Sequence, residues 1–157
     1  MEETKHAELS SLIRKISVEE LNKLESILIV DDDPVTCFLQ VNLIRESGYT
    51  GTLHDVYHAE AALAYLAENR STEASDSPGP MLILLDIKMP FVDGFEFLKK
   101  LSLEQKINRE KLHIAILTTS ISKRDYSKAS KFSIADFLVK PLTEDKLSTL
   151  IKSLPLA

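Results

Sequence analysis

The sequence has few of the residues on which several common functions depend. Its one cysteine, Cys37, excludes an internal disulfide and a cysteine-based zinc site. Its four glycines never form G-x-G or the spacing of a phosphate-binding loop, which excludes a glycine-rich nucleotide site. No apolar run approaches the length of a membrane span, and the polar start of the chain lacks the apolar core of a signal peptide. We therefore expect a cytoplasmic protein that makes no contact with a membrane.

The charge balance also limits the choice of partner. Lys and Arg number 19 against 24 Asp and Glu, so the formal net charge is -5. This balance argues against a nucleic-acid-binding protein that works through a basic face. The 157 residues, 44% of them hydrophobic, are enough for one domain with a proper core.

Short apolar runs alternate along the chain with stretches of helical periodicity. The predicted strands cover residues 27–30, 52–57, 81–85, 113–117 and 134–139. A helical pattern follows each strand, and these patterns start near Pro34, Ala61, Phe95, Ser122 and Thr143. Consecutive β-then-α units predict an α/β fold, a doubly wound parallel sheet of five strands with helices on both faces.

Two segments fall outside this alternation. Residues 1–26 form an added N-terminal helical segment, whose apolar residues at helical spacing include Leu9, Leu12, Ile13 and Ile16. Residues 17–20 have the pattern of a capping box, so two short helices or one kinked helix are expected. The segment either lies on its own domain or contacts a partner. Residues 70–80 are a polar loop, which we interpret as a tolerated insertion, with a contact or modification site as the alternative.

The apolar run 81–85 leads directly into Asp86. A carboxylate at the carboxyl end of a buried parallel strand lies where open α/β sheets keep their ligand sites. The simpler alternative is that Asp86 only caps a turn. The other strands favour a site, because three of them also end in polar residues, which are Asp31 with Asp32, Thr118, and Lys140. Since the carboxyl ends of these strands lie along one edge of the sheet, we expect the side chains to converge.

The chemistry of this set points to a cation and a phosphoryl group. Two carboxylates about 4 Å apart repel each other by on the order of 4 kcal/mol at an effective dielectric of roughly 20, so the cluster favours a bound cation or a proton. Oxygen ligands select a hard ion, and a few carboxylates with waters and a phosphate suit Mg2+ better than Ca2+. An aspartate can be the nucleophile that becomes an aspartyl phosphate. Lys140 and the metal would balance the phosphoryl charge, and Thr118 would donate a hydrogen bond to it.

These segments resemble the receiver domains of bacterial response regulators. The matching blocks are residues 30–34 (VDDDP), 85–94 (LDIKMPFVDG), 117–118 (LT) and 139–141 (VKP), in the order of the family. The resemblance covers roughly residues 25–155. It implies a flavodoxin-like sheet with strand order 2-1-3-4-5, and a division of the chain into an N-terminal extension, 1–26, and a receiver domain, 27–157.

The resemblance also implies roles for the acidic residues. Asp86 would be the phosphoacceptor. Asp31 and Asp32 would be the acidic pair that holds Mg2+, together with Asp86 and the backbone carbonyl of Lys88.

A second group of residues matches the positions through which the family changes conformation. Thr118 and Lys140 match the switch threonine and the lysine of the family pattern. Phe137 falls where the family has an aromatic switch residue, often a tyrosine, so the hydroxyl of that tyrosine is missing here. The output surface of the family combines the fourth helix, the fifth strand and the fifth helix. Here the fourth helix, about 123–131, is basic and has few apolar anchors beyond Tyr126 and Ala129, so it is either the moving element or a solvated face.

The implied function is that of a single-domain response regulator in a two-component system or phosphorelay, a signalling protein rather than an enzyme. Only 17 residues follow Lys140, which is enough for the last helix but not for a DNA-binding output domain. The chain is similar to stand-alone chemotaxis-type regulators and to small regulators of phytochrome-type kinases. The implied partners are a sensor histidine kinase or phosphotransfer protein and a downstream protein, without nucleic acid, and a homodimer is also allowed.

Two other functions compete with this interpretation. A haloacid-dehalogenase-type phosphatase also uses a strand-end aspartate, but its pattern is D-x-D-x-T, and the second aspartate position holds Lys88 here. A pseudo-receiver, which only docks partners, usually lacks part of the acidic set or the lysine, and this chain lacks neither. The four histidines show neither metal-ligand spacing nor a nucleophile–base pairing. We therefore favour the phosphoryl-accepting interpretation.

Overall fold

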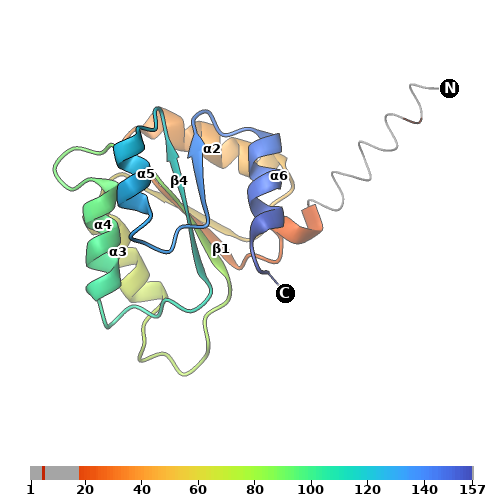
Figure 1. Cartoon of the computed structure of the whole chain (residues 1–157). Coiled ribbons are helices and arrows are strands. Elements are labelled where there is room, and N and C mark those ends of the chain that lie inside the picture. The colour runs from red at the N-terminus through yellow and green to blue at the C-terminus, as the bar shows by residue number, and fades with distance from the viewer. Residues whose placement is uncertain (1–4, 6–17, 157) are drawn as a thin grey trace.

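The computed structural model describes residue 5 and residues 18–156, and shows a sheet between two layers of helices (Figure 1). The strands are β1 (Ser26–Val30), β2 (Thr52–Val56), β3 (Met81–Leu85), β4 (Leu112–Thr118) and β5 (Asp136–Val139). The helices are α2 (Pro34–Glu46), α3 (Ala59–Asn69), α4 (Gly94–Leu103), α5 (Lys123–Ala129) and α6 (Glu144–Ser153). All neighbouring strands pair in parallel in the order β2-β1-β3-β4-β5, which confirms the predicted doubly wound fold and its strand order.

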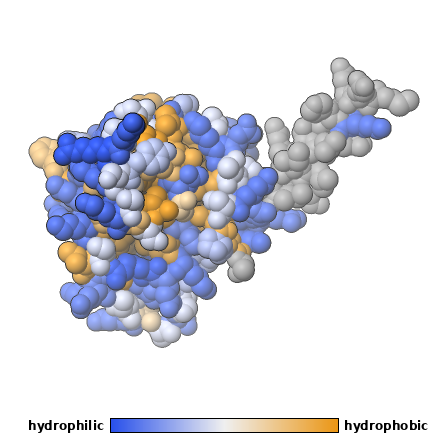
Figure 2. All heavy atoms as spheres, in the orientation of Figure 1, coloured by the Kyte–Doolittle hydropathy of each residue, from blue (hydrophilic) through white to orange (hydrophobic). Residues whose placement is uncertain are grey.

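The burial of each strand follows from its place in this order. Every residue of β1 and β3 is buried, as expected for continuous apolar runs covered on both faces. β2 and β5 form the two edges of the sheet, and both are partly exposed. Figure 2 shows hydrophilic residues over most of the visible face, with apolar side chains reaching the surface between α5 and α6, where β5 lies.

Two apolar cores fix the helices to opposite faces of the sheet. One core joins α3, α4 and α5 to the sheet through residues such as Leu66, Phe97 and Ala129. The other core joins α2 and α6 to the opposite face through residues such as Ile44 and Leu150. Each fully buried aliphatic or aromatic side chain stabilises the fold by about 1.5–3 kcal/mol, so the two cores hold the carboxyl edge of the sheet in a fixed geometry.

The sequence determines where the helices begin and where α2 ends. The side chain of the residue before each helix accepts a backbone N–H from the first turn, and these N-caps are Asp33, His58, Asp93, Ser122 and Thr143. At α5, Ser122 and Asp125 form a reciprocal capping box. Gly48, with a φ of 99°, follows α2 in a left-handed conformation that glycine adopts without strain.

Most of the predicted N-terminal helical segment, residues 1–4 and 6–17, lies outside the described residues. Residues 18–21 are helical. Leu21 and Leu24 are buried against the core of α2 and α6, with 3% and 2% exposure. The described end of this segment is therefore built into the same fold as the sheet.

The polar loop 70–80 is anchored by a buried arginine. Arg70 is 4% exposed, and its guanidinium donates to the carbonyl oxygens of Gly79 at 2.9 Å and Asn108 at 3.3 Å, and also to that of Glu110. The loop thus has a defined attachment to the connection between α4 and β4. Among the residues that the structure describes, no helix combines the length and the apolar character needed to cross a membrane.

Candidate functional site

The predicted acidic residues meet at the carboxyl ends of the two central strands. Asp31 follows β1 and Asp86 follows β3, and the last residues of these strands, Val30 and Leu85, are register partners. Asp31, Asp32 and Asp86 offer carboxylate oxygens that all lie within 4.8 Å of one another. Asp31 is 2% exposed and Asp86 is 6% exposed, whereas Asp32 is exposed. Two of the three carboxylates are thus buried, and the cluster is one that could hold a metal ion.

Lys140, the residue after β5, brings a positive charge into this cluster. Its Nζ lies 2.5 Å from Asp31 Oδ2 and 3.2 Å from Asp86 Oδ2. Three carboxylates face one ammonium, so the cluster keeps an excess of negative charge that a divalent cation would neutralise. Oxygen-only ligands of this kind suit Mg2+.

The electrostatics of the pair reflect its burial. Burial raises the pKa of Asp31 above its ordinary value, and the hydrogen bond from Lys140 offsets only part of this effect. Burial also lowers the pKa of the Lys140 ammonium, but the hydrogen bonds and charges of Asp31 and Asp86 outweigh it, so the Lys140 pKa is raised overall. Lys140 is therefore charged at neutral pH and bonded to both carboxylates.

Thr118 lies at the same edge of the sheet, at the end of β4. Its side chain is 0% exposed, and its carbonyl accepts the backbone N–H of Lys140 at 2.7 Å. Among the described residues, its hydroxyl is one of two buried side-chain polar atoms without a hydrogen-bond partner. A buried hydroxyl without a partner costs about 1–3 kcal/mol, so this atom calls for a physical explanation.

The loop after β3 orients Asp86. The backbone N–H of Lys88 donates to Asp86 Oδ1 at 2.9 Å, and the Lys88 ammonium donates to Ser120 Oγ in the loop after β4. A methyl group on Gly94 would lie 2.8 Å from the carbonyl oxygen of Asp86 and 2.6 Å from the Cα of Ile87. Only glycine permits this close approach, which holds the start of α4 against the backbone of the site.

Phe137 lies outside the acidic cluster, against α5. Its ring stacks on Tyr126 with centroids 4.8 Å apart and an interplanar angle of 24°. Tyr126 is 56% exposed, so its expected role as a core anchor of this helix is wrong, whereas Ala129 is buried as expected. α5 is only 7 residues long, and this stack joins it to β5.

The structure thus brings together Asp31, Asp32, Asp86 and Lys140, and places Thr118 next to Lys140 through a backbone bond. Two contacts near the site were not expected from the sequence, the Lys88–Ser120 hydrogen bond and the Tyr126–Phe137 stack. No periodicity or motif identifies such pairs, because each joins two segments whose proximity depends on the packing of the fold.

The comparisons with known proteins identify the same part of the chain. A family model described as the response regulator receiver domain matches residues 27–152. The chain is 29% identical to the probable methanogenesis regulatory protein FilR2 of Methanothrix harundinacea, over 82% of this chain and 79% of that protein. It is 34% identical to the transcriptional regulatory protein ZraR of Salmonella typhimurium, over 82% of this chain but only 26% of that protein. A solved structure, the two component response regulator from Cytophaga hutchinsonii, has a TM-score of 0.71 at 28% identity, and the match covers 83% of this chain and 96% of that one.

The share of each relative that the chain spans varies widely. It spans most of FilR2, but 15% of the 3',5'-cyclic-nucleotide phosphodiesterase regA of Dictyostelium discoideum and 26% of ZraR. What the chain shares with the longer relatives is therefore one domain.

Proposed function

This chain belongs to the response regulator receiver domain family, a family of two-component signalling domains, and from this premise we propose that it accepts a phosphoryl group on Asp86. The proposed donor is a sensor histidine kinase or a phosphotransfer protein. The phosphorylated protein would then signal to a downstream protein through a surface of its own.

The observation that carries the proposal is the shared contact of Lys140. One ammonium bonds both Asp31 and Asp86 within a cluster of three carboxylates. An ammonium has three N–H donors, and two are used here, so the third is available to an oxygen of a phosphoryl group on Asp86. The buried hydroxyl of Thr118, which lacks a partner, adds a further donor beside the site.

The residues present fit Mg2+ by the chemistry of their donors. Asp31, Asp32, Asp86 and the backbone carbonyl of Lys88 would hold the ion, all of them through oxygen. When bound, the ion would supply positive charge to the transferring phosphoryl oxygens.

The proposed step is a phosphoryl transfer between two nucleophiles. An oxygen of the Asp86 carboxylate attacks the phosphorus of a donor phosphohistidine, the P–O bond forms as the P–N bond breaks, and the leaving imidazole takes up a proton. Lys140 stabilises the charge that remains on the phosphoryl oxygens, and Asp86 becomes a mixed anhydride. Hydrolysis of that anhydride by water would return the carboxylate and release phosphate.

An apolar patch near the site supports a protein as the donor. Val35, Phe38 and Leu39 are 64%, 63% and 61% exposed, and they lie in the first turns of α2, which begins directly after the acidic residues. A folded domain gains nothing by exposing three large apolar side chains, whereas a protein surface that brings a histidine to Asp86 would bury them.

A small acyl phosphate tests the acceptor directly. Incubation of the protein with acetyl phosphate and Mg2+ should add one phosphoryl group to the intact mass, and Asp86→Asn should abolish the gain because it removes the nucleophile. Asp93→Asn is the matched control, since Asp93 caps α4 in the same loop but lies outside the cluster, and asparagine caps a helix equally well. Phosphorylation of the Asp86→Asn protein at the wild-type rate would refute the assignment.

A further inference from the structure

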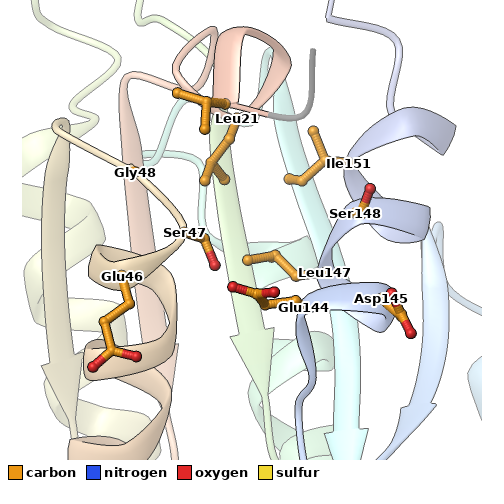
Figure 3. A pocket seen from close by; sticks show the side chains of 10 residues that line it. Leu21, Glu46, Ser47, Gly48, Glu144, Asp145, Leu147, Ser148 and Ile151 are labelled. Atoms are coloured by element: carbon orange, nitrogen blue, oxygen red, sulfur yellow. The ribbon is translucent and has the colours of Figure 1, made fainter. Parts of the chain in front are cut away.

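A groove lies on the face of the molecule that carries α2 and α6, apart from the acidic site. It has a volume of about 230 Å³ and runs between the end of α2 and the length of α6, with residues 18–21 closing one end (Figure 3). Leu21, Leu147 and Ile151 supply apolar lining, and Glu46, Glu144 and Asp145 supply carboxylates. The groove is therefore apolar along part of its length and acidic along the rest.

The three carboxylates of the groove have no basic partner within the described part of the chain. Among residues 5 and 18–156, no basic side chain lines the groove and none of the three carboxylates forms a salt bridge. Glu144 and Asp145 lie in the first turn of α6, where negative charge is favourable to the helix. Glu46 is the last residue of α2, where the helix dipole disfavours a carboxylate, so its presence needs another reason.

The sequence just before residue 18 has the complementary character. Leu9, Leu12, Ile13 and Ile16 share one face at helical spacing, and Arg14 and Lys15 add positive charge. Seven helical steps separate Leu9 from Ile16, about 10 Å, and the same number separates Glu144 from Ile151 along α6. The apolar stripe is therefore as long as the wall of the groove.

The covalent connection favours binding within one chain. Val18 itself lines the groove, and only Ser17 separates it from Ile16. The capping-box pattern at 17–20 predicts a helix start or a kink there, and either would let the chain change direction before residue 18. A segment attached at the rim of its binding site has a high effective concentration there, which a partner in solution must exceed.

We propose that residues 9–16 bind in this groove of the same chain. The apolar stripe packs against Leu147 and Ile151, and Lys15, beside the stripe, lies among the carboxylates of the rim. The inference does not depend on phosphoryl transfer, since the groove contains none of the acidic-site residues.

A nitroxide spin label on Ser11→Cys tests the proposal in the full chain. Cys37 is fully buried, and burial raises the pKa of its thiol to about 12, so the native cysteine does not react with the labelling reagent. We expect the label to broaden the amide signals of Ser47, Gly48 and Ser148 but not those of α4, which packs on the opposite face of the sheet.

Substitutions on the two sides of the segment serve as test and control. Leu12→Asp adds a charge to the apolar stripe and should weaken docking by about tenfold or more, so the broadening should disappear. Ser10→Asp adds the same charge outside the stripe and should preserve it.

Three results would overturn the proposal. The first is the absence of broadening in the groove, and the second is broadening that Leu12→Asp leaves unchanged. The third is broadening that appears only when isotope-labelled protein is mixed with separate spin-labelled molecules, which would assign the groove to a second copy of the chain.

Discussion

Lys140 is the residue on which the acidic site depends most. Its ammonium is shared by Asp31 and Asp86, and the exposed Asp32 completes the cluster without a bond to it. Asp32 therefore differs from Asp31 and Asp86 in its electrostatic environment. Asp31 and Asp86 have a fixed counter-charge, whereas Asp32 adds negative charge that only a bound cation would neutralise.

This difference predicts the behaviour of Asp32→Asn. The substitution should lower the Mg2+ affinity by roughly an order of magnitude or more, because a charged ligand is lost. The free energy of unfolding without metal should be unchanged or higher by up to about 1 kcal/mol, because repulsion in the cluster falls and Asp32 is exposed. Mg2+ titration and urea unfolding measure the two effects.

Asp33→Asn is the control for this prediction. It removes the same charge from the adjacent residue, keeps the N-cap of α2 and leaves the cluster intact, so the affinity should stay near that of the wild type. An undiminished Mg2+ affinity in Asp32→Asn would show that Asp32 is not a ligand.

At the scale of the elements, Arg70 fastens the loop 70–80 to the connection between α4 and β4. Arg70→Lys keeps the charge but cannot bond the carbonyls of Gly79, Asn108 and Glu110 together, because an ammonium lacks the fork of the guanidinium. The free energy of unfolding should fall by about 1.5–3 kcal/mol, because the buried guanidinium loses hydrogen bonds that an ammonium cannot replace.

Arg109→Lys is the comparison variant, because Arg109 lies in the same connection between α4 and β4. Arg109 is exposed and donates to the carbonyls of Leu101 and Ser102, so its replacement should cost about 1 kcal/mol or less. Urea unfolding that ranks the two variants equally would mean that the loop is not held by Arg70.

The capping box of α5 predicts a pH dependence confined to that helix. The hydrogen bond from the backbone N–H of Ser122 lowers the pKa of Asp125 below its ordinary value of 3.8. A carboxyl whose pKa is lower in the folded state stabilises that state above its unfolded pKa, and this contribution is lost as the pH falls through the folded pKa. The protection of α5 amides should therefore decrease more than that of α4 as the pH drops below 3.8.

Asp125→Asn removes the titrating group and should flatten this difference. Amide protection factors, measured by NMR across the acidic pH range in both proteins, test this prediction. An α5 that loses protection in parallel with α4 in both proteins would contradict the prediction.

The elements also show what the sequence could and could not predict. The continuous apolar runs of β1 and β3 identify buried strands without ambiguity, and the polar residues after them locate the site. In α2 the apolar residues cover more than one face, and periodicity does not say which face meets the sheet. Cys37 and Ile44 are buried there, whereas Phe38 is 63% exposed.

Contacts between segments distant in the sequence could not be predicted from it, for a different reason. Arg70 binds carbonyl oxygens, which every residue has, so no partner residue type marks the contact. The Tyr126–Phe137 stack joins an exposed helix residue to an edge strand, and only the packing of α5 on the sheet brings the two rings together.

At the scale of the whole molecule, phosphorylation of Asp86 should act on α5 and β5. A phosphoryl group would draw the Thr118 hydroxyl and Lys140 toward itself, and the Tyr126–Phe137 stack joins β5 to a short helix with few buried residues. A shift between two states needs only a few kcal/mol of differential contact.

We therefore expect amide exchange to change in residues 118–131 and 137–142 on phosphorylation, with α2 nearly unchanged. Amide exchange is compared between the phosphorylated protein and the Asp86→Asn protein treated in the same way. Identical protection across α5 would eliminate this switch and leave its basic residues as a solvated face.

The central claim, that Asp86 carries the phosphoryl group, is tested most directly by chemical trapping of the anhydride. Borohydride reduces an aspartyl phosphate to an alcohol, which converts the phosphorylated aspartate to homoserine and leaves free carboxylates unchanged. After treatment with acetyl phosphate and Mg2+, peptide mass spectrometry should find homoserine at position 86, and none when the metal is chelated. Homoserine at another aspartate, or unmodified Asp86 in protein whose intact mass shows the added phosphoryl group, would contradict the account.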